Sequence, residues 1–307
     1  LSDYFIENQT KTEFRDNSSW VILSPIEQSI KRKIEEIGTP LKDWNVNIYR
    51  GILTGYNEAF IISGEKRTEL LAACGTEKER IRTDELIRPI LRGRDIKRYN
   101  YEFADLWLIN THNGIKEKGI SRIDIDDYPT IKAHLDQYWD QISTRADKGD
   151  TPYNLRNCAY MDDFNKQKIV WAETMRIKRG NDERFPRFTW TDCDILTDKT
   201  CFFATGNNLK YIVGVLNSII GRYQCKNVVS ILDNGGYLMQ KIFIEKIIIP
   251  NANTLDILNI ERLVDILLQA DIKMAEREKC ELELDILICN LFHLTQNEYQ
   301  FILRGIE

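Results

Sequence analysis

Isoleucines recur at helical spacing between Ile26 and Ile37, and this repeat predicts a helix with one apolar face. Ser24 is a suitable N-cap, and Glu27 stands where a capping box requires an acidic residue. The helix is expected to end before Gly38. Because an apolar stripe is usually buried, we expect this helix to pack on the body of the protein or on a preceding domain.

The same helical period appears in later stretches. The expected ranges are 68–74, 128–146, 208–223 and 254–291, the last as one long helix or a broken pair. Thr295 and Glu298 form a capping box for a final short helix. The helices after residue 253 combine an apolar stripe with an acidic back, which is typical of a packing element and not of a DNA-binding face.

Short apolar runs predict strands between these helices, at residues 46–49, 60–62, 106–109, 169–171, 200–204 and 241–249. The first two runs flank a segment that contains Gly51 and Gly55 and are expected to pair as a hairpin. Interspersed helices and strands indicate a mixed α/β (α+β) domain, followed by a helical C-terminal tail.

Composition narrows the class of protein. The 307 residues suit one large or two modest domains, and 43% apolar content is ample for a core. No apolar run is long enough for a membrane span and no signal-peptide pattern occurs, so a cytoplasmic location is expected. The seven cysteines are scattered and the three histidines lie far apart, which argues against a zinc site. A start at Leu1 and not at Met suggests a fragment of a longer chain.

Charge is unevenly distributed along the chain. The net charge is −5, but the residues from Asn253 onward carry −6, so the preceding residues carry +1. Two basic clusters lie in that nearly neutral part, at residues 88–98 and 166–190. Clustered Arg and Lys suit phosphate binding, and Glu173, Arg176 and Asn181 have side chains that read base edges. The alternatives are a solvated loop for the first cluster and a charged hairpin tip for the second.

Four motifs together resemble a known family. Residues 51–60 read Gly-Ile-Leu-Thr-Gly-Tyr-Asn-Glu-Ala-Phe, which resembles the opening signature of the TaqI-like C-terminal specificity domain. That domain is the target-recognition module of type IIG restriction-modification enzymes and related adenine-specific DNA methyltransferases. Residues 90–99, 216–218 and 247–250 fit the same family in the same order, so that the resemblance covers roughly residues 40–295.

The resemblance implies a module that recognises double-stranded DNA. Residues 1–45 would lead in from an upstream catalytic domain, residues 46–252 would form the target-recognition domain, and residues 253–307 would brace it. Arg156 ends a Tyr-x-Leu-Arg stretch that the family also shows. The expected DNA-binding residues are Arg50, Thr54, Asn57, Arg92, Arg94, Lys97, Arg98, Arg156, Glu173, Arg176, Lys178, Arg179 and Arg187.

No catalytic motif accompanies these residues. The sequence has no Asn/Asp-Pro-Pro-Tyr/Phe motif, no glycine-rich S-adenosylmethionine loop and no convincing Pro-Asp…Glu-x-Lys nuclease site. We therefore expect no cofactor or metal in this chain. S-adenosylmethionine and the methyl transfer to adenine would belong to an upstream methyltransferase domain of the same polypeptide, with or without an attached nuclease, and the chain would be monomeric.

A second hypothesis is a protein-interaction scaffold that uses the C-terminal helices. It predicts an oligomer that forms without DNA, whereas the first hypothesis predicts salt-sensitive DNA binding. An isolated enzyme is disfavoured by the missing motifs. The sequence does not give the recognised bases, because target-recognition contacts come from variable loops and a single chain does not show which side chains reach the groove.

Overall fold

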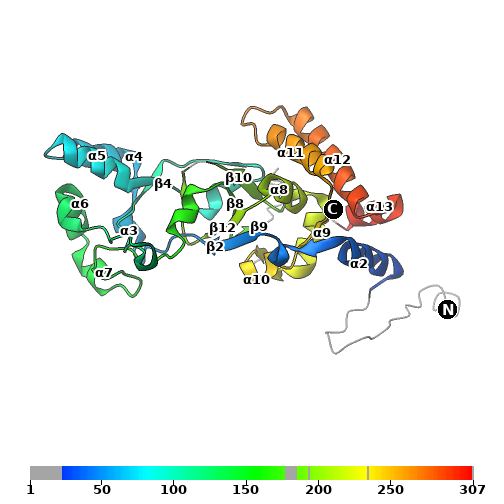
Figure 1. The fold of residues 1–307 in the computed structure, drawn as a ribbon, viewed down its shortest axis with the longest axis horizontal. Coiled ribbons are helices and arrows are strands. Elements are labelled where there is room, and N and C mark those ends of the chain that lie inside the picture. Colours follow the sequence, from blue (N-terminus) through cyan, green and yellow to red (C-terminus); the bar gives the residue numbers. More distant parts are fainter. Residues whose placement is uncertain (1–22, 177–184, 193, 234, 306–307) are drawn as a thin grey trace.

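The structure is a computed structural model that describes residues 23–176, 185–192, 194–233 and 235–305. Its centre is an antiparallel sheet in the order β10-β8-β12-β2. These strands are β2 (Val46–Arg50), β8 (Lys168–Ala172), β10 (Phe188–Thr191) and β12 (Cys201–Gly206). The mixed α+β class and the helical C-terminus predicted from the sequence are confirmed (Figure 1).

The two faces of the central sheet bury two separate hydrophobic cores. Successive side chains of a strand point to opposite faces. Ile169 and Trp171 accordingly join the first core, whereas Val170 joins the second. In β12, Phe202 and Phe203 divide in the same way. Because both faces are covered, all five residues of β8 are buried, and even Lys168 is fully buried in this strand.

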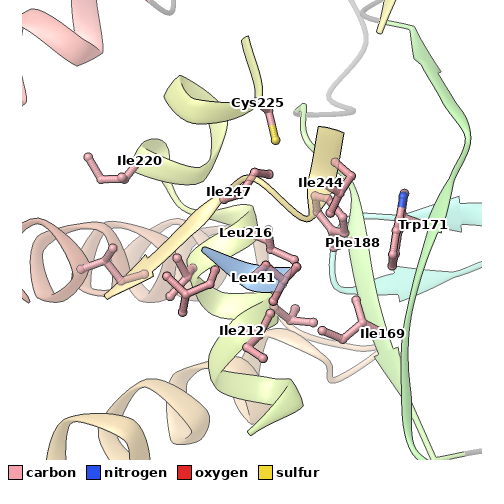
Figure 2. Close-up of a cluster of buried hydrophobic side chains, with 14 of the residues drawn as sticks. Leu41, Ile169, Trp171, Phe188, Ile212, Leu216, Ile220, Cys225, Ile244 and Ile247 are labelled. Carbon is pink, nitrogen blue, oxygen red and sulfur yellow. The ribbon is translucent and has the colours of Figure 1, made fainter. Parts of the chain in front are cut away.

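The first core lies between the sheet and the helices towards the C-terminus (Figure 2). Figure 2 shows Ile169 and Trp171 from β8 beside Ile212 and Leu216. The elements on this side are α2 (Pro25–Ile37), α8 (Leu209–Asn217), α9 (Ile219–Val228), α10 (Lys241–Ile244), α11 (Thr254–Leu267), α12 (Met274–Leu291) and α13 (Gln296–Arg304).

The second core occupies the opposite end of the molecule, around a sheet in the order β11-β4-β7-β3 (Figure 1). Its strands are β3 (Ile61–Ser63), β4 (Ile87–Leu91), β7 (Leu106–Ile109) and β11 (Leu196–Thr197). Its helices are α3 (Asn57–Phe60), α4 (Gly64–Ala72), α5 (Glu77–Leu86), α6 (Pro129–Asp136) and α7 (Trp139–Thr144).

Three small sheets complete the described strands. β1 (Gly38–Pro40) pairs with β15 (Ile248–Pro250), and β5 (Ile96–Lys97) pairs with β6 (Asn100–Tyr101). The third sheet has the order β13-β14-β9, from Ser230–Ile231, Gly236–Leu238 and Thr174–Arg176. Within the described ranges, no helix is both long and apolar enough to cross a membrane. The same ranges hold no group of three or more His, Cys, Asp or Glu side chains placed for a metal ion.

The predicted glycine hairpin is wrong. β2 pairs with β12, and β3 pairs with β7, so the two predicted partners belong to different sheets. The segment between them runs from the central sheet into the second core and ends in the single turn of α3. Apolar runs show where strands form, but their pairing depends on residues about 40 to 160 positions away along the chain.

Gly51 is required for a close backbone approach at the end of β2. Its N–H donates to the Cys201 carbonyl oxygen at 2.9 Å, and a Cβ atom at this position would overlap the Asp198 carbonyl oxygen. We expect Gly51→Ala to lower the free energy of unfolding by about 1–3 kcal/mol, because the backbone must shift to make room. Gly75→Ala is the control, since the nearest atom to its Cβ would be Glu79 Oε2 at 3.7 Å. Equal stability of the two variants in urea denaturation would contradict the steric argument.

Three predicted elements are divided or changed. The expected helix 128–146 is interrupted between α6 and α7, and the helix 208–223 is interrupted at Ser218. Ser218 Oγ accepts a hydrogen bond from the Gly221 N–H and thereby caps α9. The expected strand 241–249 instead contains α10 followed by β15. A continuous apolar run fits either a buried helix or a buried strand, so periodicity alone did not separate them.

The C-terminal helices are a broken pair, α11 and α12, followed by α13. They pack on α8, where Gly214 lets the side chains of Ile260 and Val264 approach closely. Arg98 adds a polar tie, because its Nε donates to Glu281 Oε1 on α12 at 3.1 Å. These contacts hold the tail against the face of the central sheet that forms the first core.

Helix α2 docks on the body, as its apolar stripe predicted. Ile30 and Ile34 are buried in the first core. The polar side of the junction is formed by Glu298 at the start of α13, which accepts from Ser29 Oγ at 2.7 Å and from Lys33 Nζ at 2.7 Å. Burial alone would raise the pKa of Glu298, but hydrogen bonds from Lys33, Ser29 and Thr295 lower it to about 2.

This carboxylate makes the α2–α13 junction sensitive to acid. A lowered pKa contributes stability that is present above the unfolded-state pKa and is lost as the pH falls through the folded-state value. Between pH 4.5 and pH 2 we expect Glu298 to lose about 3 kcal/mol of its contribution. Urea denaturation at several pH values should therefore show a shallower acid dependence for Glu298→Gln than for the unchanged chain. Glu283→Gln, at a half-exposed position of α12, should keep the full dependence.

Candidate nucleic-acid interface

The two basic clusters meet in one open groove of about 740 Å³. We call it the basic groove. Five cationic side chains line it, against the carboxylates of Glu173 and Asp198. Seven residues predicted from the sequence lie in its lining, namely Asn57, Arg92, Arg94, Lys97, Glu173, Arg176 and Arg187.

The first cluster reaches the groove through a short 3₁₀ turn, η2 (Gly93–Asp95). Asp95 accepts from the backbone N–H and the guanidinium of Arg92, both from Nε at 3.0 Å and from Nη2 at 2.8 Å. The Gly93 N–H donates to Thr200 Oγ1 at 2.8 Å, next to β12. A side chain at Gly93 would crowd the Thr200 carbonyl oxygen at 2.9 Å. The turn is therefore fixed directly against the end of the central sheet.

The cations of the groove differ in how far they are engaged within the protein. Arg92 is paired with Asp95, which raises the pKa of Arg92. Arg187 is buried and donates to the Arg176 carbonyl oxygen at 3.3 Å. Lys97 forms an ion pair with Glu102, with 3.7 Å between Lys97 Nζ and Glu102 Oε2. By contrast, the side chains of Arg94 and Arg176 are exposed and have no ion-pair partner among the described residues.

Glu173 is held at the edge of the groove by two other elements. Its Oε2 accepts from Arg50 Nη2 at 2.7 Å and its Oε1 accepts from Gln240 Nε2 at 3.1 Å. Arg50 also donates to the Lys199 carbonyl oxygen at 3.1 Å. These bonds fix the plane of the carboxylate without using all of its lone pairs. Arg50 thereby links Glu173, which lines the basic groove, to a neighbouring pocket that Arg50 itself lines.

This neighbouring pocket, the second pocket, has a volume of about 650 Å³. Arg50, Arg156 and Lys199 supply its positive charge. Arg156 is exposed and pairs with Asp147 at 3.1 Å, so its charge is only partly offset. The Arg50–Glu173 ion pair joins the linings of the two cavities. The positive surface therefore continues beyond the basic groove.

Two predicted contact residues, unlike the buried Arg187, line neither the basic groove nor the second pocket. The Arg98 side chain is only 12% exposed, because it is committed to Glu281. Thr54 is 1% exposed, and its hydroxyl donates to Asn57 Oδ1 at 2.5 Å, which orients Asn57 at the groove. Both are corrected from surface contacts to supporting roles, because their polar atoms are used inside the protein. Lys178 and Arg179 lie outside the described residues.

Several residues of the interface were not identified in the sequence. Gln240 and Thr200 position Glu173 and the η2 turn, and Lys199 lines the second pocket. None of them stands in a charged cluster or a motif, so no local signal marked them. Asp198 was missed as well, and burial raises the pKa of its carboxyl group against the hydrogen bonds from Thr200.

Comparison with known proteins identifies a related fold. No protein-family model and no curated protein matches this sequence. Among solved structures, the type IIL restriction-modification enzyme MmeI in complex with DNA matches with a TM-score of 0.63 and 13% identity, over 87% of this chain and 36% of that one. The type IIG restriction endonuclease BpuSI matches with a TM-score of 0.47 and 12% identity, over 87% of this chain and 33% of that one. This chain thus shares the fold of about a third of MmeI.

Proposed function

We propose that this chain is the target-recognition domain of a restriction-modification enzyme and binds double-stranded DNA through the basic groove. The observation that carries the proposal is the meeting of two sequence-distant basic clusters in one open groove. The fold supports it, because the similar part of MmeI belongs to a protein solved in complex with DNA. The four family motifs point to the TaqI-like type of specificity domain.

The groove offers both kinds of contact that sequence-specific DNA binding uses. Arg94 and Arg176 are exposed cationic side chains that can displace the counterions of phosphates. Glu173 and Asn57 present acceptor and amide groups of the kind that read base edges. Because Glu173 is already held by Arg50 and Gln240, it loses little side-chain freedom on binding.

Methyl transfer is proposed to occur on another domain. The TaqI-like resemblance points to adenine-N6 methylation, with S-adenosylmethionine held by a methyltransferase domain that this chain would direct to its site. In such an enzyme the reacting base leaves the duplex to reach the methyltransferase. The role of this chain would be to fix the position of the duplex, and its own residues would take no part in the bond changes.

The test is binding of a short mixed-sequence duplex by the whole chain, measured by fluorescence anisotropy. We expect the affinity to fall steeply between about 50 and 200 mM salt, since several phosphates are neutralised. Selection from a randomised duplex pool should then enrich one short sequence. Absence of salt-dependent binding would overturn the proposal.

A second candidate function is protein interaction through the C-terminal helices. Five large apolar side chains on α11 and α12 are about half exposed or more, namely Leu255, Leu258, Met274, Leu282 and Ile286. Size-exclusion chromatography separates the two candidates. A stable oligomer that forms without DNA, in a chain that lacks salt-dependent DNA affinity, would favour the scaffold.

A further inference from the structure

The lining of the second pocket is cationic. Arg50, Arg156 and Lys199 come to it from three separate segments of the chain. Among the described residues that line this pocket, none is acidic. The basic groove differs, because the carboxylates of Glu173 and Asp198 lie among its cations. The second pocket therefore favours an anionic ligand.

These cations are exposed and keep hydrogen-bond donors that the protein does not use. The side chains of Arg50 and Arg156 are 51% and 59% exposed. Arg50 donates from Nε to the Lys199 carbonyl oxygen and from Nη2 to Glu173, and Arg156 donates from Nη1 to Asp147. A guanidinium has more N–H groups than these bonds engage, so both side chains retain donors for a ligand. Lys199 is exposed and has no ion-pair partner among the described residues.

Tyr160 supplies the same pocket with a fixed aromatic ring. The side chain is half-buried, and its ring stacks on Tyr49 with 4.5 Å between the centroids and 17° between the planes. Its hydroxyl donates to the Arg50 carbonyl oxygen at 3.0 Å. Because both the ring and the hydroxyl are held before a ligand arrives, little side-chain freedom is lost when a ligand packs on this residue.

The cations and the ring of Tyr160 belong to one site. Burial, followed by the Cys158 thiol, raises the pKa of Tyr160 to about 12, whereas the positive charges of Arg156 and Arg50 act in the opposite direction. Both charges must therefore lie near the Tyr160 hydroxyl. Lys199 is adjacent to Arg50, because Arg50 Nε lies 3.1 Å from the Lys199 carbonyl oxygen.

Most of the other lining side chains are apolar, namely Ile52, Leu53, Leu155, Ala159 and Met161. Phosphate alone has no use for an apolar wall, whereas the face of an unstacked base is stabilised by covering one. Cations beside an aromatic ring are the combination with which proteins bind single-stranded nucleic acid. The pocket volume of about 650 Å³ lies within the range of roughly 300–1,000 Å³ of small-molecule sites, so one nucleotide can be accommodated.

We propose that the second pocket binds one unstacked nucleotide of DNA, with its phosphates at Arg50, Arg156 and Lys199 and its base against Tyr160. DNA is the source because the Arg50–Glu173 ion pair joins this pocket to the basic groove, so a duplex held in the groove brings an unpaired residue to the pocket. In this respect the inference rests on the proposed function. Every base has an apolar face, so the pocket accepts any base.

The first experiment measures binding of three DNA molecules to the whole chain by fluorescence anisotropy. They are a fully paired duplex, the same duplex with one bulged thymidine, and the same duplex with an abasic residue in the bulge. We expect the bulged thymidine to bind about tenfold more tightly than the paired duplex and at least about fivefold more tightly than the abasic bulge. The abasic bulge keeps the phosphates and the backbone flexibility and lacks only the base. Equal affinities of the two bulged duplexes would overturn the proposal.

The same measurements separate this inference from the proposed function. Salt-dependent binding of the paired duplex with equal affinities of the two bulged duplexes would overturn this inference alone. A gain from the bulged thymidine without binding of the paired duplex would overturn the proposed function alone, and binding of none of the three would overturn both. Free thymidine 5′-monophosphate should bind at least about 100-fold more weakly than the bulged duplex, because it lacks the contacts of the basic groove. Equal affinity of the free nucleotide would overturn DNA as the source.

Arg156→Ala combined with Lys199→Ala supplies the mutational test. Both side chains are exposed, so the variant should fold. We expect its preference for the bulged thymidine over the paired duplex to disappear, because the phosphates of the unstacked nucleotide lose their cations. Lys116→Ala with Arg122→Ala removes the same charges from exposed positions that line neither the basic groove nor the second pocket, and should keep the preference. Retention of the preference in Arg156→Ala with Lys199→Ala would overturn the assignment of these cations.

Discussion

Replacing both Arg94 and Arg176 by alanine is expected to weaken duplex DNA binding about 10- to 100-fold near 0.1 M salt. These two side chains line the basic groove, are exposed and have no ion-pair partner among the described residues. Each contact with a phosphate contributes about 0.9 to the slope of log affinity against log salt. The double variant should therefore show a slope smaller by about two, measured by anisotropy across a salt series.

The matched control removes the same net charge elsewhere. Arg32 on α2 and Arg304 on α13 are exposed, and Figure 1 shows these helices at the far end of the first core from the central sheet. Arg32→Ala with Arg304→Ala should leave the slope nearly unchanged, because long-range effects of surface charge are screened. An equal loss in both double variants would mean that net charge, and not the basic groove, governs binding.

Arg98→Met is expected to lower the free energy of unfolding by about 3–5 kcal/mol. The Arg98–Glu281 pair is almost fully buried, with 12% and 5% of the side chains exposed. Removing the guanidinium leaves the Glu281 carboxylate inside the protein without this partner, and desolvation of that charge is then poorly compensated. Urea denaturation measures the loss, and the salt slope of DNA binding should stay unchanged in the folded variant.

Two further variants test whether the loss of stability in Arg98→Met comes from the broken ion pair or from lost packing of the arginine stem. Arg98→Met combined with Glu281→Leu should recover much of the stability, since apolar replacement of both partners removes the uncompensated charge. Arg262→Met breaks an exposed ion pair, in which Arg262 Nη2 lies 3.8 Å from Glu283 Oε1. It should lower the free energy of unfolding by less than about 1 kcal/mol. A double variant as unstable as Arg98→Met alone would assign the effect to packing of the arginine stem.

The candidate site was only partly predictable from the sequence. Both basic clusters were visible, because charge density is a property of neighbouring residues. Their meeting was not visible, because it depends on contacts between distant segments, such as the hydrogen bond between Gly93 and Thr200, 107 residues apart. Nor did the sequence distinguish Arg94, which is exposed, from Arg98, which is buried against a helix near the other end of the chain.

The sequence by itself determined the elements whose cause is local. The start of α2, the capping box of α13 and the apolar stripe of α11 depend on residues three or four positions apart, and all of them form. Tertiary structure alone decided the strand partners, the division of the β8 side chains between two cores, and which arginines are exposed and which are buried. Those outcomes depend on contacts between distant segments, whose free energies no single stretch of sequence contains.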